Sequence, residues 1–159
     1  MTTDYEIDNL DRQILEYLRR DGRMAFTEIA QKLIVSAGTI HQRVNKMTDA
    51  GIITGSKITV DYSKLGYDVT SLMGIYLKSA RDLEMVMNRL RTFDEIVEVY
   101  YTTGSYALII KARTRTTDAF YQFLLRKLQA IPEIQSTESF ICLAQPIDRD
   151  LPLADLEGV

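Results

Sequence analysis

The sequence predicts an α+β protein in two parts, and two observations carry this prediction. Apolar residues recur every three or four positions from Asp8 to Ala50, which is the spacing of amphipathic helices. Beyond Asp61, strand-like and helix-like patterns alternate in the order β-α-β-β-α-β. We therefore expect a winged-helix-like helix-turn-helix domain with a hairpin linker at residues 1–60, and a ferredoxin-like βαββαβ domain at residues 61–159.

The composition is that of a soluble globular chain and excludes several other classes. The 159 residues are 46% hydrophobic and 26% charged, a mixture that can build a core. Apolar stretches reach only about six residues, whereas a membrane-spanning helix needs roughly 18–20. The single cysteine, Cys142, excludes an intramolecular disulfide framework and is expected as a buried core thiol. With no basic, apolar leader visible, a cytoplasmic location is expected.

The first domain should hold three helices whose ends are marked by capping residues. Asp8 can cap the first helix, with Asp11 as its reciprocal partner, and Asp21-Gly22 ends it. Ser36 can cap the third helix, and Gly51 can end it. The expected helices span residues 9–20, 26–33 and 36–50.

The third helix presents polar side chains of the kinds that read DNA. Arginine and lysine suit phosphate or guanine, and glutamine and asparagine suit the edge of adenine. The net charge is −3 over the whole chain, yet Lys32, Arg43, Lys46 and Lys57 face only Asp49 between residues 32 and 57. A basic face on an acidic protein is compatible with DNA binding, although the same face could be the solvated side of a three-helix bundle. The predicted DNA-binding residues are Ser36, Gly38, Thr39, His41, Gln42, Arg43, Asn45 and Lys46.

Alternating residues predict the linker hairpin and the second domain. Ile52-Ile53 and residues 57–60 flank Thr54-Gly55-Ser56, a pattern typical of a small hairpin. In the second domain the expected strands are 69–78, 97–102, 106–112 and 134–143, and the expected helices are 83–92 and 117–131.

Two polar segments of the second domain could bind a zwitterionic amino acid. Backbone amides and hydroxyls beside a glycine can hold its carboxylate, and a side-chain carboxylate or carbonyls can accept its ammonium. Ordinary turn and strand-entry residues would explain the same pattern without a ligand. The predicted effector-binding residues are Tyr100, Thr102, Thr103, Gly104, Ser105 and Tyr106 in the first segment, and Gln135, Ser136 and Thr137 in the second.

Nothing in the sequence indicates an enzyme. The chain has no glycine-rich nucleotide loop and no HExxH motif. His41 and Cys142 are its only histidine and cysteine, and neither lies in a catalytic motif. We expect no catalytic residue, no metal site and no cofactor.

Several motifs in order carry a resemblance to a known family over residues 5–148. In this numbering they are Asp8-Asn9-Leu10-Asp11-Arg12, Gly38-Thr39-Ile40-His41, Arg43-Val44, residues 50–55, residues 65–69, residues 100–104 and residues 133–138. The chain resembles the Lrp/AsnC (feast/famine) transcriptional regulators of bacteria and archaea, and within them the asparagine-responsive members most. Ile34 departs from the glycine that the family commonly has in the turn before the third helix. Either it is strained by about 1–2 kcal/mol or the turn is reshaped.

The resemblance implies a ligand-gated transcription factor that binds double-stranded DNA. Its effector would be a small amino acid, with L-asparagine the first choice. Such proteins dimerise through their C-terminal sheets, commonly assemble into octamers, and hold the effector at interfaces between dimers. Open alternatives are a leucine- or methionine-responsive regulator, an effector-independent one, or an amino-acid-sensing subunit of a metabolic enzyme.

Overall fold

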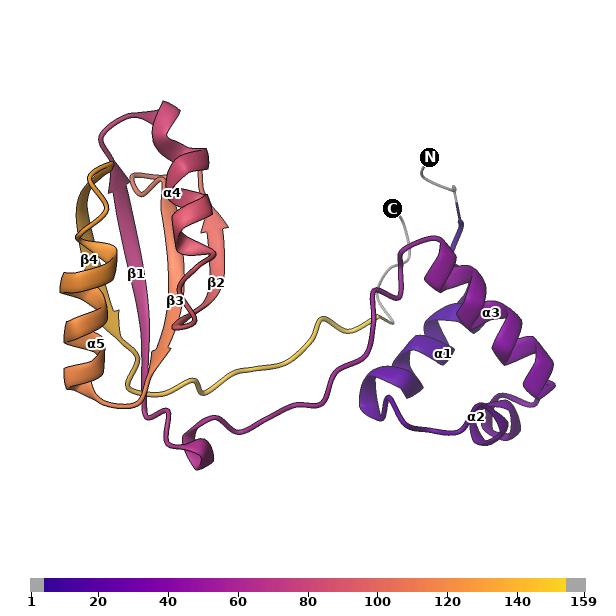
Figure 1. The fold of residues 1–159 in the computed structure, drawn as a ribbon. Coiled ribbons are helices and arrows are strands. Elements are labelled where there is room, and N and C mark those ends of the chain that lie inside the picture. Colours follow the sequence, from indigo (N-terminus) through magenta and orange to yellow (C-terminus); the bar gives the residue numbers. More distant parts are fainter. Residues whose placement is uncertain (1–4, 154–159) are drawn as a thin grey trace. The chain divides into compact units, whose positions relative to one another are not determined.

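The computed structural model describes residues 5–153 (Figure 1). The chain divides into two compact units. Of the described residues, the first unit holds 5–59 together with 149–153, and the second runs from Val60 to Asp148. Among the described residues no helix has the length and apolar character to span a membrane.

The first unit is a bundle of α1 (Asn9–Arg20), α2 (Phe26–Leu33) and α3 (Ala37–Asp49). The three predicted helices are confirmed. So is the reciprocal cap at the start of α1, where the Asp8 carboxylate accepts the Asp11 N–H at 2.9 Å and Asp11 accepts the Asp8 N–H at 3.2 Å. The bundle closes on a small apolar core formed by Ile14, Ile29, Ala30, Ile40 and Met47.

The turn between α2 and α3 keeps a left-handed backbone at Ile34. This residue has φ 56° and ψ 44°, a region that suits glycine. The Val35 N–H donates to the Ala30 carbonyl at 3.0 Å and the Ile34 N–H to the Gln31 carbonyl at 3.4 Å, the paired bonds of a Schellman motif. The turn is therefore strained rather than reshaped.

Ile34→Gly should raise the free energy of unfolding by about 1 kcal/mol. Glycine relieves about 1–2 kcal/mol of strain in the left-handed backbone. Part of this gain in stability is offset because glycine also raises the conformational entropy of the unfolded chain. No apolar burial is lost, because Ile34 is 92% exposed. Urea denaturation followed by far-UV circular dichroism measures the change. Ile34→Ala keeps most of the strain and is the control, and equal stability of the glycine and alanine variants would contradict this account.

The predicted hairpin after α3 is wrong. Residues 52–60 contain no strand. The N–H groups of Ile52 and Ile53 donate to the Met47 carbonyl at 2.8 and 3.1 Å, so these two residues complete the end of α3. Beyond them Ile58 is 70% exposed. A lone two-stranded hairpin with no surface to pack on is marginal in water.

The tail also differs from the predicted domain boundaries, because residues 149–153 group with the first unit. Arg19 lies 3.5 Å from the Asp150 carboxylate, and the Glu16 carboxylate accepts the Leu153 N–H at 3.2 Å. Both partners are on α1. The boundary predicted at residue 60 is close to the observed one, but the tail does not belong to the second unit.

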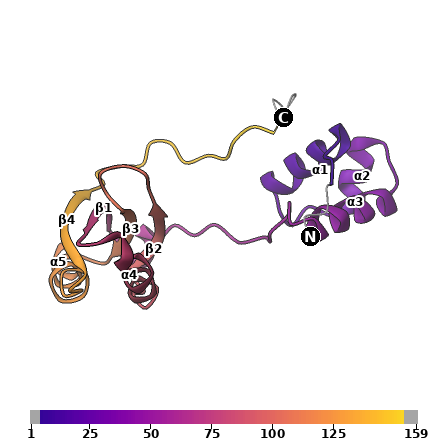
Figure 2. The same cartoon turned by 90° about the horizontal axis from the view of Figure 1, so that it is seen from above.

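The second unit is a four-stranded antiparallel sheet with helices on one side (Figures 1 and 2). The strand order in the sheet is β2-β3-β1-β4, so the predicted βαββαβ order is confirmed. Its elements are β1 (Val69–Leu77), α4 (Leu83–Leu90), β2 (Ile96–Tyr101), β3 (Leu108–Thr114), α5 (Thr117–Phe123) with a π-helical turn (Leu124–Leu128), and β4 (Ile134–Ile141). Short 3₁₀ turns lie at Ser63–Leu65 and Ala80–Asp82.

Two details of this unit differ from the expectation. β3 begins at Leu108, so Tyr106 belongs to the loop before it and not to the strand. Cys142 lies just beyond β4 and is only half-buried, because it follows Glu138 and Phe140 in the alternation that faces away from the helices. Cys142 is therefore not a core thiol.

The two faces of the sheet differ in character. The helix-covered face carries Met73, Ile75, Leu108, Ile110 and Ala112, all 0% exposed. On the opposite face, which is open in this chain, Leu72 is 39% and Phe140 is 51% exposed. Large apolar side chains on an open face mark a surface that is suited to contact with another protein.

Candidate functional site

The outward face of α3 brings together five of the predicted DNA-binding residues. Gly38, Gln42 and Asn45 are spaced four and three residues apart, so they lie one above another on the helix. His41 and Lys46 flank this row, and all five are exposed. A Cβ added at Gly38 would meet only the Ser36 hydroxyl, at 3.7 Å, so nothing within the chain requires glycine there. This face offers amide, imidazole and ammonium groups to an external partner.

Ser36, Thr39 and one side of the His41 ring are engaged within the first unit. The Ser36 hydroxyl oxygen accepts the Thr39 N–H at 3.0 Å and lies 2.9 Å from the Thr39 hydroxyl, which caps the helix. His41 packs edge-on against Phe26 of α2, with ring centroids 4.6 Å apart. These contacts fix the start of α3 and its distance from α2.

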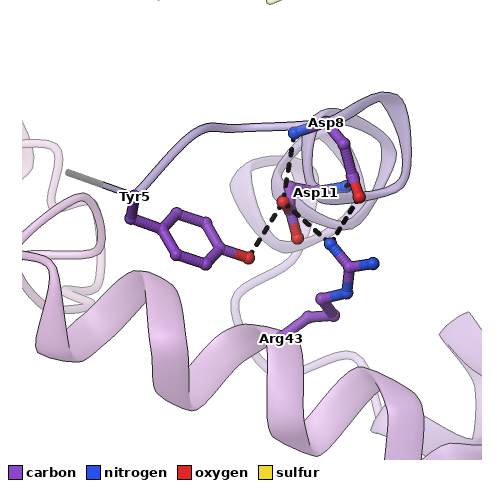
Figure 3. A network of polar contacts seen from close by, with 4 residues as sticks. All are labelled: Tyr5, Asp8, Asp11 and Arg43. Atoms are coloured by element: carbon purple, nitrogen blue, oxygen red, sulfur yellow. Dashed lines mark hydrogen bonds and ion pairs between the residues drawn. The ribbon is translucent and has the colours of Figure 1, made fainter.

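Arg43 turns away from the exposed face of α3 and binds the start of α1 (Figure 3). Its guanidinium donates to the carboxylate of Asp8 at 2.5 Å and to that of Asp11 at 3.2 Å. The Tyr5 hydroxyl donates to the same Asp11 oxygen, Oδ2, at 3.0 Å. Asp11 is 0% exposed, so Arg43 provides the cation beside a buried carboxylate.

The charges in this network shift one another's pKa. The backbone N–H of Asp11, and after it Arg43, hold the pKa of Asp8 below its usual value. The Asp8 carboxylate raises the pKa of Arg43 above its already high value. The sequence predicts that Arg43 binds DNA, and in the structure its side chain joins α3 to α1 within the unit.

The loop between β2 and β3 contains five of the nine predicted effector residues, Thr102 to Tyr106. It is closed by the Thr102 N–H, which donates to the Ala107 carbonyl at 3.1 Å, and by the Thr102 hydroxyl, which donates to the Tyr106 carbonyl at 2.5 Å. Thr103, Gly104 and Ser105 are exposed at its tip. The tip therefore presents a glycine and hydroxyl groups on a closed loop, as the sequence argument requires.

The Tyr106 ring lies over Gly74 on the open face of the sheet. A Cβ at Gly74 would come within 2.3 Å of this ring, so only glycine leaves room for it. The Tyr106 hydroxyl donates to the Glu138 carboxylate on β4, and its ring lies 5.0 Å from that of Tyr76. The bond to Glu138 raises the pKa of Tyr106 to about 12.

The remaining predicted effector residues lie at opposite edges of the sheet. Tyr100 is on β2, where its hydroxyl donates to Glu98, whereas Gln135, Ser136 and Thr137 are on β4. β3 and β1 separate these edges, a spacing of about 14 Å. Thr137 also pairs with the buried Ile75 and accepts a hydrogen bond from Gln129 at 3.3 Å, so it faces the helices. Within one chain Tyr106 reaches across the sheet to Glu138 of β4, whereas Tyr100 stays at the opposite edge.

Gly74 and Glu138 belong to this site but are not among the predicted effector residues. A single glycine inside an apolar strand is a signal of close approach by another group, and it was available at Gly74. The pairing of Tyr106 with Glu138 joins residues 32 positions apart and has no local signal. Within residues 5–153 no three His, Cys, Asp or Glu side chains are grouped as metal ligands.

Family models match both units of the chain. Residues 7–54 match a winged helix-turn-helix DNA-binding domain, and residues 70–152 match the Lrp/AsnC ligand binding domain. Together they cover the α3 face and the Tyr106 loop described above.

Curated relatives match nearly the whole chain. Regulatory protein AsnC of Haemophilus influenzae is 49% identical over 147 residues, which are 92% of this chain and 98% of that protein. Regulatory protein AsnC of Escherichia coli K12 is 51% identical over 92% of this chain and 97% of its own length. The HTH-type transcriptional regulator Ptr1 of Methanocaldococcus jannaschii is 33% identical over 86% of this chain and 92% of its own.

Solved structures agree with these relatives. E. coli AsnC superposes with a TM-score of 0.90 at 50% identity, covering 93% of this chain and 99% of that one. A transcriptional regulator of Neisseria meningitidis in complex with L-Met has a TM-score of 0.88 at 21% identity, covering 94% of this chain and 98% of that one; this match shows the fold alone.

Proposed function

Because this chain belongs to the Lrp/AsnC family of transcriptional regulators, we propose that L-asparagine is its effector and controls how it binds DNA. The chain is a DNA-binding regulator with a ligand-binding domain, and its family is not one of enzymes. The observation that carries the asparagine proposal is the identity of about half of its residues with proteins named AsnC, over 92% of the chain. Its place of action would be the cytoplasm, where the DNA is.

The exposed face of α3 is the proposed DNA-reading surface. Gln42 and Asn45 have the amide geometry that pairs with adenine, and Lys46 supplies a cation for phosphate or guanine. Gly38 would let the backbone come close to the groove. Arg43 would contribute by fixing the angle between α3 and α1, since its guanidinium is bound to Asp8 and Asp11.

Replacing Lys46 should weaken DNA binding almost equally on all sequences. If it neutralises one phosphate, Lys46→Ala lowers the slope of log K against log salt by about one. Gln42→Ala should instead leave the slope unchanged and cost about 1–3 kcal/mol at one base pair. Fluorescence anisotropy at several salt concentrations, with DNA selected from a random pool, measures both. As the control, Lys127→Ala removes one positive charge from the second unit and should change neither the salt slope nor the DNA affinity. If Lys46→Ala keeps the wild-type slope and affinity, Lys46 is not part of the interface.

The effector site would be completed by a second protomer. The Thr102–Tyr106 loop offers hydroxyls and a glycine for the effector carboxylate, and Glu138 offers a carboxylate for its ammonium. Gln135 and Ser136 lie on the far edge of the sheet. We propose that Gln135 and Ser136 of a second chain complete the site, so ligand binding would depend on assembly. We therefore propose a homodimer formed through the open sheet face, assembled further into an octamer.

A thermal-shift screen of the full chain against the twenty amino acids tests the effector. A ligand that binds only the folded assembly raises its melting temperature by mass action. A shift with asparagine supports the proposal. A shift with leucine or methionine instead would identify a different effector for the same fold. No shift at millimolar ligand would favour an effector-independent regulator. Absence of any DNA binding would favour a sensing subunit.

A further inference from the structure

Arg113 near the end of β3 and Arg115 just after it hold the chain segment that leads into β1. The guanidinium carbon of Arg113 lies 4.9 Å from the ring centroid of Tyr62, and that of Arg115 lies 4.7 Å from that of Tyr67. Arg115 also donates to the Leu65 carbonyl at 3.3 Å. The two tyrosine rings meet edge-on at 6.3 Å. We call Tyr62, Tyr67, Arg113 and Arg115 the arginine clasp.

The clasped segment has a fixed local structure. It forms the 3₁₀ turn Ser63–Leu65, and the Tyr67 N–H donates to the Tyr62 carbonyl at 3.0 Å. Gly66 follows with φ 81°, and a Cβ there would come within 3.2 Å of the Arg115 guanidinium. The clasp therefore sets the path of the chain as it enters the second unit.

β3 connects the clasp to the Thr102–Tyr106 loop, which we call the effector loop. At its start the Ala107 N–H donates to the Ile75 carbonyl at 3.0 Å, and the Ala107 carbonyl accepts the Thr102 N–H. β3 is hydrogen-bonded to β1 on one side and to β2 on the other. Between the loop and the clasp its inward side chains are fully buried. A strand of this length spans about 20 Å, and a close-packed interior has low compressibility and transmits strain.

We propose that the arginine clasp couples effector binding to DNA binding, by transmitting displacement of β3 to the chain that leads to the DNA-binding unit. The inference rests on the proposed effector function. Arg113 and Arg115 are positioning residues in this account, since neither lies in the effector loop or on α3. The cation–π contacts need the face of the tyrosine ring and not its hydroxyl.

The test compares the DNA affinity of the full chain with and without saturating L-asparagine. The ratio of the two affinities is the coupling factor, and allosteric proteins typically show about 5–150-fold. In Arg113→Ala/Arg115→Ala we expect the factor to fall below about twofold, while DNA still binds and calorimetry still detects asparagine. Arg81→Ala/Arg126→Ala removes the same two charges elsewhere in the second unit and should keep the wild-type factor.

Substitutions of Tyr62 separate the clasp from general destabilisation. Tyr62→Phe keeps the ring and should keep the coupling factor, whereas Tyr62→Leu keeps an apolar side chain and should lower it. A wild-type factor in Tyr62→Leu or in the double arginine variant would overturn the inference and leave the proposed function standing. A wild-type protein whose DNA affinity does not respond to asparagine would overturn both.

Discussion

Arg43→Ala should lower the free energy of unfolding of the first unit by about 3 kcal/mol. The change leaves the fully buried Asp11 carboxylate without the cation that lies 3.2 Å from it. Removing one partner of a buried ion pair typically costs about 3–5 kcal/mol. The Arg43 side chain is 31% exposed, which places the effect at the lower end of that range. Urea denaturation followed by far-UV circular dichroism measures it.

Two companion variants show whether the loss comes from the ion pair. The double variant Arg43→Ala/Asp11→Ala also lacks the buried charge. Asp11→Ala should therefore cost less stability in the Arg43→Ala background than it does in the wild type. Lys46→Ala, on the exposed face of the same helix, should alter stability by less than about 0.5 kcal/mol. An Arg43→Ala protein as stable as the wild type would contradict the assigned role. The salt slope of DNA binding should stay unchanged in the folded fraction, whereas a phosphate contact would reduce it.

The same network predicts a loss of stability in acid. The pKa of Asp8 is lowered in the folded protein, so folding favours its charged form. This contribution is complete above the unfolded-state pKa of about 4 and is lost as the pH falls through the lower folded value. Asp8→Asn should therefore show a smaller fall in stability between pH 5 and pH 2 than the wild type does, by acid titration of the circular dichroism signal.

Gly74→Ala should displace Tyr106 and abolish most of the effector response. The new Cβ would lie 2.3 Å from the Tyr106 ring, and overpacking of this kind typically costs about 1–3 kcal/mol. The ring can escape only by leaving Glu138 and Tyr76. We expect at least about a tenfold loss of asparagine affinity, the equivalent of 1.4 kcal/mol, measured by calorimetry.

A tyrosine titration reports the displacement directly. With its hydroxyl bonded to Glu138, Tyr106 has a pKa of about 12. In Gly74→Ala it should ionise nearer the ordinary value of about 10. Gly104→Ala is the matched control, because its Cβ would meet only the Thr102 hydroxyl, at 4.0 Å. A tyrosine that still titrates near 12 in Gly74→Ala would contradict the placement of the ring.

Local signals in the sequence predicted the elements of the fold well. The reciprocal Asp8–Asp11 cap and the Ser36 cap act over three residues and were read correctly. The order of strands and helices follows from the change of period. The hairpin at residues 52–60 failed because alternating residues specify a strand only where a partner strand or a core is present.

The site was harder to predict because its contacts are long-range. α3 was recognised as a polar helix, yet Arg43 lies beside its buried stripe, and the carboxylates that bind it are 32 and 35 positions earlier. The two effector segments were predicted from their chemistry. Neither segment contains a signal for the strand order β2-β3-β1-β4, which sets their positions in the sheet. A list of polar residues does not show which of them are engaged within the fold.

The central claim is that one chain combines an α3 that binds DNA with a sheet domain whose amino-acid ligand alters that binding. The most direct test is the affinity of the wild-type protein for its selected DNA, by fluorescence anisotropy, without and with millimolar L-asparagine. The account predicts a change of at least about fivefold in either direction, together with no change for D-asparagine. An affinity that is the same with and without L-asparagine would contradict it.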